Sequence, residues 1–217
     1  MITISKEDYL KAIVRAEAEG QAAIPAALAE GLRVTRPAVT AALKRLRKDG
    51  LLRVTKDGTI LLTNQGREIA LRTIFRHHMI ERMLTEVFDM PWYAVHDEAE
   101  RLEHAVSEAF EKKLVEKLGQ KDVCPHGNGL TMRSDAERRK HGLTLLSEAH
   151  EGKKYRVASV YERDRKLLEF FEHEGIRPGT NLSVQARNYD DTITLSIGNG
   201  SVRLGLPAAS RVWVGKA

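Results

Sequence analysis

The chain has 217 residues, of which 42% are hydrophobic and 30% are charged. This balance is typical of a globular protein and excludes an intrinsically disordered one, and the length allows two or three domains with separate cores. The formal net charge of +5 fits a polyanionic partner, although a basic charge alone is weak evidence for one.

The cysteine count and the hydrophobic runs indicate where the protein works. Cys124 is the only cysteine, so an internal disulfide framework is excluded, as is usual in a reducing cytoplasm. No apolar run approaches the roughly 18 to 20 residues that a membrane-spanning helix needs. The amino terminus has acids at Glu7 and Asp8 and lacks the apolar segment of a signal peptide. We therefore expect a cytoplasmic protein without a membrane partner.

The first part of the chain predicts three helices and a hairpin. Apolar residues recur at helical spacing over 5–18, and a short helix is expected over 25–30. A third helix is expected over about 36–49, and the two extended runs around 56–58 indicate a β-hairpin. This order of elements is that of a winged helix-turn-helix domain.

The third helix is expected to contact DNA. Its inner face is apolar and its outer face carries basic and hydroxyl side chains, which suits the major groove of DNA, while the wing and helix ends hold phosphates. The alternative is a winged helix that contacts another protein. The residues expected at base edges are Thr35, Arg36, Pro37 and Thr40, and those expected at phosphates are Lys44, Arg47 and Lys56.

Two long helices are expected next, from Asn64 to a point before Asp89 and from Pro91 to about Leu118. Their apolar surface exceeds what one small domain can cover, which favours pairing with a second copy of the chain. They also carry histidines and acids at helical spacing, so that each group projects from one helix face. These residues are His77, Glu81, His96, Glu100, Glu103 and His104. The mixture of nitrogen and hard oxygen donors suits a divalent first-row metal, and a solvated charged face is the alternative.

The remainder of the chain predicts a loop-rich stretch and then a β-rich domain. Cys124 and His126 lie in the loop-rich stretch and are by themselves a weak indication of a metal site. From Lys154 onward, short alternating runs separated by turn residues, with one helix over 164–173, predict a small β-barrel.

Taken together, these features resemble the diphtheria-toxin-repressor and manganese-transport-regulator family. The most specific portions are TRPAVTAALKRLRKDGLL, RHHMIERML and MPWYAVHDEAERLEH, and YERDRKLLEFFEHEGIRPG resembles the family's SH3-like domain. The resemblance implies a mainly α protein with β, in three domains: a winged helix-turn-helix over 1–71, a helical metal-binding and dimerisation domain over 72–150, and an SH3-like small β-barrel over 151–217. It also implies a dimeric, metal-activated repressor that binds a palindromic operator in double-stranded DNA and is not an enzyme.

The resemblance implies two metal positions. The activating one corresponds to Asp8, Glu100, Glu103 and His104. The second corresponds to His77, Glu81 and His96, with Cys124, His126 and a carboxylate of the third domain as additions; Asp164 is the first choice for this carboxylate and Glu162 the second.

The choice of metal follows from departures from the iron-type pattern. Iron-type members of the family carry methionine at the position of Asp8 and cysteine at that of Glu100, and the oxygen donors here favour Mn²⁺, with Fe²⁺ as the alternative. Lys11 stands where two-domain manganese regulators have a glutamate, so a close metal pair is in doubt. Ala41 replaces a glutamine of the recognition helix, which indicates a different base preference.

The expected mechanism is that metal joins the first helix to the dimerisation domain. Without metal, clustered carboxylates would repel one another, and with it the two recognition helices would be spaced for successive major grooves, about 34 to 36 Å apart. Two rivals remain open, a helical metalloenzyme of the carboxylate type and a winged-helix regulator that senses an organic ligand. The Glu-x-x-His pairs of di-iron helical proteins are missing, because Arg101 and Tyr93 stand three residues before His104 and His96.

Overall fold

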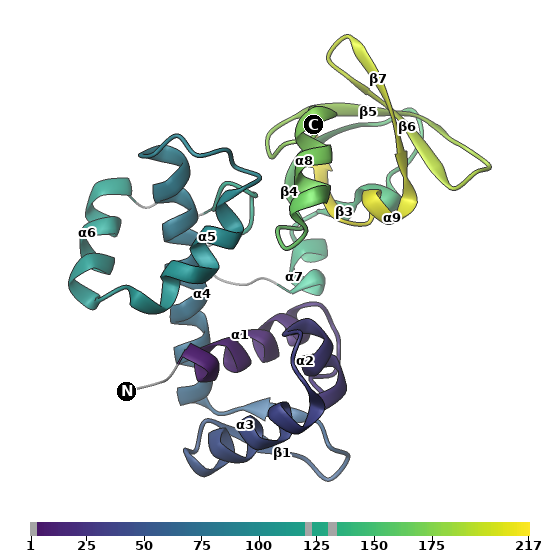
Figure 1. Cartoon of the computed structure of the whole chain (residues 1–217). Helices are drawn as coiled ribbons and strands as arrows, with labels where there is room; N and C mark the ends of the chain where they lie inside the picture. The colour runs from purple at the N-terminus through teal and green to yellow at the C-terminus, as the bar shows by residue number, and fades with distance from the viewer. Residues whose placement is uncertain (1–3, 120–122, 130–133) are drawn as a thin grey trace.

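A computed structural model of the chain describes residues 4–119, 123–129 and 134–217. Figure 1 shows three parts in chain order: a helical N-terminal part with a small hairpin, a helical middle part, and a C-terminal part built on a sheet. The long helix α4 (Asn64–Glu86) joins the first part to the second.

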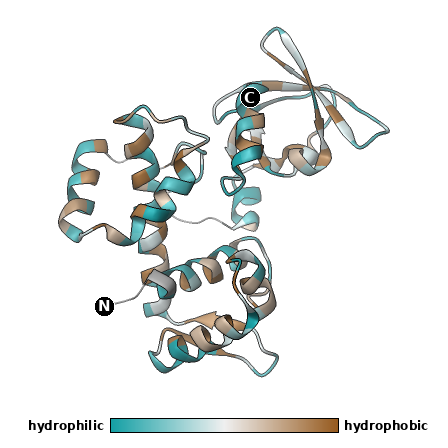
Figure 2. Ribbon diagram, in the orientation of Figure 1, coloured by the Kyte–Doolittle hydropathy of each residue, from teal (hydrophilic) through white to brown (hydrophobic). Residues whose placement is uncertain are grey.

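The N-terminal part has the expected order of elements. These are α1 (Ile4–Ala18), α2 (Pro25–Gly31), α3 (Arg36–Lys48), β1 (Leu52–Val54) and β2 (Ile60–Leu62). The Thr35 side chain accepts a hydrogen bond from the Ala38 N–H and so caps α3. The apolar faces of the three helices close over β2, whose three residues are all hydrophobic and appear brown in Figure 2. The prediction of a winged helix-turn-helix is confirmed.

Helix α4 packs closely against the end of the N-terminal core. A Cβ added to Gly66 would lie 2.0 Å from the carbonyl oxygen of Leu51, so only glycine permits this approach. Further along, the buried face of α4 changes from apolar to polar, and His77, His78 and Glu81 are all at most 2% exposed. The second half of α4 therefore positions polar groups inside the protein.

The second long helix of the middle part is broken. The expected helix to Leu118 is divided into α5 (Val95–Leu102), a 3₁₀ turn η1 (Glu103–Ala105) and α6 (Glu108–Leu118). The break occurs because Val106 is extended and Ser107 caps α6 by accepting the Phe110 N–H. Glu103 still donates its N–H to the carbonyl of Ala99 and has helical backbone angles, so the chain leaves the helical path only at Val106.

The C-terminal part is an antiparallel sheet with short helices. Its elements are α7 (Asp135–Lys140), β3 (Thr144–Leu145), η2 (Leu146–Glu148), β4 (Lys154–Val160), α8 (Arg165–His173), β5 (Asn181–Arg187), β6 (Thr192–Ile197), β7 (Gly200–Gly205), α9 (Leu206–Ala209) and β8 (Val212–Lys216). The strand order is β3-β8-β4-β5-β6-β7, and register shifts interrupt the β4–β8 and β5–β6 pairs. Leu168 and Phe171 of α8 pack into the core of this sheet. The hydrophilic helix α7 lies outside the sheet and is teal in Figure 2.

Three hydrophobic clusters support the three parts. One covers residues 9–74, a smaller one covers 79–114, and the third covers 146–214. The exact domain boundaries stay a prediction, because α4 crosses the expected one at 71. Among the helices that the structure describes, none is both long and apolar enough to cross a membrane.

Candidate metal centres

The first candidate centre, which we call the interdomain position, joins α1 to η1. Its donors are Asp8, Glu103 and His104, whose ligand atoms lie within 4.8 Å of one another. His104 Nε2 is 3.0 Å from Asp8 Oδ1, and His104 Nδ1 is 2.5 Å from Glu7 Oε2. Two segments almost a hundred residues apart in sequence therefore place nitrogen and oxygen donors together.

Glu100, expected as a fourth ligand here, lies beside Glu103 and is held by cations of α1. Lys11 is 2% exposed, and its ammonium group donates to Glu100 Oε2 at 2.7 Å and to Glu103 Oε1. Arg15 donates to Glu100 Oε1 at 3.3 Å. The expectation that these carboxylates repel one another without metal is therefore wrong, because Lys11 and Arg15 neutralise them.

The second candidate centre, the triad position, consists of His77, Glu81 and His96. His77 Nε2 is 2.9 Å from Glu81 Oε1 and 3.0 Å from His96 Nδ1, and His96 Nδ1 is 3.1 Å from Glu81 Oε1. An octahedral ion with bonds of about 2.1 Å holds neighbouring ligands about 3 Å apart. The three donors therefore have the mutual spacing of ligands on one face of such an ion.

A tight loop brings Cys124 and His126 to the same region. Val160 N–H donates to the carbonyl of His126 at 2.9 Å, which fixes the loop to β4. Gly127 has φ of 78°, and a Cβ there would lie 2.1 Å from the carbonyl oxygen of Ala158, so the loop can approach β4 only with glycine. Both Cys124 and His126 are buried, and His126 Nδ1 is 3.3 Å from Glu81 Oε2.

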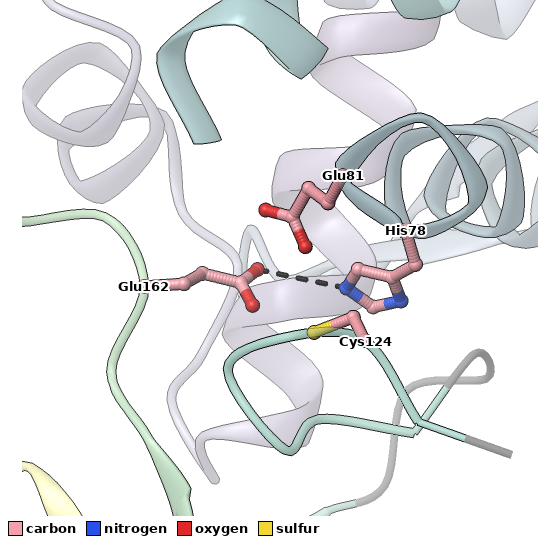
Figure 3. Close-up of side chains that lie close together, drawn as sticks. All are labelled: His78, Glu81, Cys124 and Glu162. Carbon is pink, nitrogen blue, oxygen red and sulfur yellow. Dashed lines mark ion pairs between the residues drawn. The ribbon is translucent and has the colours of Figure 1, made fainter. Parts of the chain in front are cut away.

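The carboxylate that the C-terminal part contributes is Glu162 (Figure 3), not Asp164. Asp164 is exposed and caps α8 by accepting the Leu167 N–H at 3.1 Å. Glu162 is 7% exposed and accepts from Asn128 Nδ2 at 2.6 Å. The first choice made from sequence was therefore misplaced, because the side chain at a helix N-cap turns back to its own backbone.

The histidines in the two centres have raised pKa values. Burial lowers the pKa of His77, but the Glu81 and Glu103 carboxylates outweigh it and raise that pKa to about 9. Burial likewise lowers the pKa of His104, but hydrogen bonds with Asp8 and Glu7 raise it to about 9. Without metal, both imidazoles are thus cations at neutral pH and supply positive charge between the carboxylates.

The acidic groups and the thiol respond to the same buried charges. Burial raises the pKa of Glu81, but the nearby imidazoles of His126 and His77 hold it well below its ordinary value. Burial, together with the Glu81 and Glu162 carboxylates, raises the pKa of the Cys124 thiol well above its ordinary value. The thiol is therefore protonated unless a cation replaces its proton.

All seven residues expected to contact DNA are exposed. Thr40 Oγ1 donates to the carbonyl of Arg36 at 3.1 Å, which keeps this hydroxyl at the start of α3. Lys56 lies in the turn between β1 and β2. The remaining members of the set are Thr35, Pro37, Lys44 and Arg47. Their contacts with DNA stay a prediction.

Comparison with known proteins assigns most of the chain to three domain families. Residues 1–60 match the family described as "Iron dependent repressor, N-terminal DNA binding domain", residues 63–129 match "Iron dependent repressor, metal binding and dimerisation domain", and residues 144–216 match "FeoA domain". The iron-dependent repressor IdeR of Mycobacterium leprae is 31% identical over 97% of this chain and 96% of its own. The chain belongs to the diphtheria-toxin-repressor family.

Relatives within this family include proteins named for either metal. The diphtheria toxin repressor of Corynebacterium jeikeium is 30% identical over 90% of both chains. A solved structure titled "Manganese-dependent transcriptional repressor complex with manganese" has a TM-score of 0.86 at 31% identity and covers 98% of this chain and 100% of its own. The manganese regulator SloR has a TM-score of 0.78 at 28% identity, with 98% of each chain covered.

The membership confirms the coarse predictions of fold and function. The chain is a metal-dependent, DNA-binding transcriptional repressor rather than an enzyme, and it pairs with a second copy and with operator DNA. Whether manganese or iron activates it is not decided by the family, whose members carry both names.

Sequence reasoning missed three side chains at these centres. Glu7 was not among the expected ligands, yet its carboxylate contacts His104. Lys11 was noted as a departure, but its bonds with two expected ligands were not foreseen. His78 is buried beside the triad position, although helical spacing turns it about 100° away from His77.

Proposed function

We propose that this repressor is activated by Mn²⁺ at the interdomain position and that the triad position holds a further divalent ion. The observation that carries the proposal is the meeting of Asp8 from α1 with Glu103 and His104 from η1. These donors are two carboxylates and one imidazole. Hard oxygen donors of this kind suit Mn²⁺ better than softer ions.

Glu100 completes the proposed interdomain set. Its carboxylate shares Lys11 with Glu103, so the two carboxylates lie next to each other and Glu100 would be within reach as a further oxygen donor to an ion held by Glu103. Burial raises the pKa of Glu100, but Arg15 and Lys11 outweigh it and lower that pKa, so the carboxylate is ionised and available as a ligand.

The chain's own residues explain how occupancy of this position would control DNA binding. A bound divalent ion supplies positive charge that the carboxylates of both domains share. Asp8 belongs to α1, whose apolar face packs in the same core as α3. Holding Asp8 against Glu103 and His104 therefore fixes the orientation of α3 relative to the dimerisation domain. The ion must favour this orientation over others, since equal affinity for all orientations would change nothing.

DNA recognition would follow from the orientation of α3 in both copies. Thr35, Arg36, Pro37 and Thr40 lie at the first turns of α3, where base edges are contacted in such domains. Lys44, Arg47 and Lys56 are exposed cations placed to hold phosphates. The exposed hydrophobic residues Phe88 and Phe110 of the helical part support pairing of two copies there.

Fe²⁺ is the second candidate. Two histidines and one carboxylate on a single face, as in His77, His96 and Glu81, are typical of ferrous sites. The relatives from Mycobacterium leprae and other mycobacteria are also named as iron-dependent. The interdomain donors nevertheless favour manganese, because they include no sulfur.

The test is metal-dependent DNA binding by the full chain. Metal-free protein is titrated with Mn²⁺, and anaerobically with Fe²⁺, against a duplex selected from a random pool in the presence of each ion. We expect retarded complexes only with metal, at a lower free concentration of Mn²⁺ than of Fe²⁺. Metal-independent DNA binding would refute activation by metal, and a lower threshold for Fe²⁺ would refute the choice of manganese.

A further inference from the structure

The turn between α2 and α3 contains an arginine in a backbone conformation that residues with a side chain rarely adopt. Arg33 has a φ of 54°, which lies in the left-handed region that favours glycine. The other non-glycine residues with positive φ in the described part of the chain are Asp89 and Asp191. Aspartate tolerates this region because its short side chain can form local hydrogen bonds. Arginine lacks that property, so the conformation of Arg33 costs the folded protein free energy.

The end of α2, where Arg33 lies, has the same hydrogen bonds as the ends of other helices in this protein. The Arg33 N–H donates to the carbonyl of Glu30 at 3.1 Å. The Val34 N–H donates to the carbonyl of Ala29 at 3.0 Å, which completes a Schellman motif. The second residue after α1, α3, α7 and α8 also has positive φ and is glycine in each case: Gly20, Gly50, Gly142 and Gly175. Glycine would therefore end α2 with less strain, and the arginine at this position requires another explanation.

The Arg33 side chain is exposed and its charge is unpaired. Among residues 4–119, 123–129 and 134–217, none forms a hydrogen bond or an ion pair with its guanidinium, although Glu30 lies one turn earlier. Arg15 and Arg67 of neighbouring helices, in contrast, are each paired with a carboxylate. Arg36 is exposed three residues further on, and α3 contains no acidic residue. Arg33 therefore extends the basic surface of α3 into the turn that precedes it.

The place of this turn relative to DNA follows from the geometry of a helix-turn-helix. The helix before the turn crosses the sugar–phosphate backbone, and the helix after it lies in the major groove. The turn that joins α2 to α3 (Figure 1) therefore passes the rim of the groove, where the phosphates are. Arg33 stands two residues before Thr35, which is expected at a base edge. A long cationic side chain at this point is within reach of a phosphate.

We propose that Arg33 contacts an operator phosphate at the rim of the major groove, and that its strained backbone is retained because it presents the guanidinium there. The contact positions α3 but reads no sequence, since phosphates carry no base information. The inference deepens the proposed function by adding a contact to the seven residues expected from sequence. It rests on the DNA recognition proposed above, but not on the choice of manganese.

The proposal requires stability and DNA binding to change in opposite directions at one residue. Arg33→Gly relieves the backbone strain and removes the charge, Arg33→Gln removes the charge alone, and Arg33→Lys keeps the charge. Arg33→Gly should therefore raise the melting temperature of the full chain by roughly 2 °C, whereas the other two variants should melt like the wild type. Thermal unfolding followed by circular dichroism measures this.

DNA binding by the same variants is measured by fluorescence anisotropy at saturating Mn²⁺ over a series of salt concentrations. The duplex is one selected with the wild type. Arg33→Gly and Arg33→Gln should bind about tenfold more weakly at low salt, and the slope of log affinity against log salt should become shallower by about 0.9 for each copy bound. Arg33→Lys should keep its affinity, because a phosphate accepts a point charge. Arg203→Gln, which removes an exposed charge from β7 of the C-terminal part, is the matched control and should bind like the wild type.

Three results would overturn the inference. Wild-type affinity and salt slope in Arg33→Gly and Arg33→Gln would exclude the phosphate contact. A loss of affinity in Arg33→Lys as large as that in Arg33→Gln would indicate a base contact instead. A melting temperature of Arg33→Gly no higher than that of Arg33→Gln would show that the backbone is not strained. Metal-independent binding by the wild type would count against the proposed function, whereas the comparison of the variants would still decide the role of Arg33.

Discussion

The interdomain and triad positions use the same kinds of side chain in opposite settings. At the interdomain position, Asp8 is about 30% exposed and belongs to the DNA-binding part, whereas Glu103 is buried in the helical part. At the triad position, the side chains of His77 and Glu81 are completely buried and lie on one helix, and that of His96 is 8% exposed. The interdomain position thus spans the DNA-binding part and the helical part, whereas the triad position lies within the helical part alone.

This difference assigns different tasks to similar ligands. A site that spans two bodies gains a ligand only when they approach, so its occupancy and their orientation are coupled. A site whose donors all belong to one part of the protein binds without rearrangement of the parts and contributes mainly to stability. Glu103 connects the two, because it contacts Lys11 and also accepts from His77 Nδ1 at 2.7 Å. We therefore expect the interdomain position to govern DNA binding.

The largest effect is expected from His104→Ala. The change removes the imidazole between Asp8 and Glu103 and leaves the buried Lys11–Glu103 pair intact. Metal-dependent DNA binding should be lost, which means at least about a 1,000-fold fall toward non-specific affinity. Mobility shifts with and without Mn²⁺ measure this, and size-exclusion chromatography should still show a folded dimer. A variant that keeps its metal response would show that the interdomain position does not control DNA binding.

Lys11→Met should separate folding from metal binding. Removing Lys11 takes away one cation of the buried ion pair and leaves Glu103 with only His77 and His104, so the metal-free protein should lose on the order of 3 kcal/mol of unfolding free energy. Mn²⁺ should bind about tenfold tighter, because the ammonium no longer competes for the carboxylates. Lys6→Met is the matched control, since Lys6 is on the same helix and its ion pair with Asp49 is partly exposed. Chemical denaturation and calorimetric titration of both variants test this, and equal effects would refute the competition.

The winged helix could be predicted from sequence because its information is local. The apolar spacing of α3, the cap at Thr35 and the hairpin turn each depend on neighbouring residues, and the structure has them within one or two positions. The break at Val106 was missed, because the helical spacing continues through Ser107 and only the capping bond of Ser107 reveals a new helix start. A pattern with a period of 3.6 does not show where one helix ends and another begins on the same face.

The sequence predicted which kinds of side chain bind metal, but it did not predict all of the residues that lie together in space. His77, Glu81 and His96 were identified together because two of them share a helix face and the resemblance supplied the third. His78 and Glu162 depend on packing between α4, the loop at 124 and β4, which no spacing in the sequence encodes. Non-local contacts of this kind become visible only when the three parts are assembled.

The stability of the metal-free protein should depend on pH through both positions. The folded pKa values of His77 and His104 are raised to about 9 from an ordinary 6.5. Their contribution is therefore fully present below about pH 6.5 and is lost as the pH rises through 9. Thermal unfolding measured from pH 6 to 10 should therefore show a steady fall in the melting temperature as the pH rises through this range. His104→Gln should remove only the part of the pH dependence that comes from the interdomain position. A wild-type stability that does not change with pH would contradict the conclusion that His77 and His104 are cations in the metal-free protein.

The smallest effect is expected from Asp8→Met, which changes the metal preference of the interdomain position without moving it. Asp8 is partly exposed, so a methionine can be accommodated there while its thioether replaces a carboxylate oxygen. A softer donor should shift the ranking of Fe²⁺ against Mn²⁺ by about tenfold toward iron. The measurement is the free concentration of each ion that gives half-maximal DNA binding, compared with Asp49→Met as a surface control that keeps all proposed ligands. Because the triad position is unchanged, ions bound there should keep their ranking in both variants. If the ranking of Fe²⁺ against Mn²⁺ in DNA binding is the same in Asp8→Met as in the wild type, ligand softness at Asp8 does not select the metal.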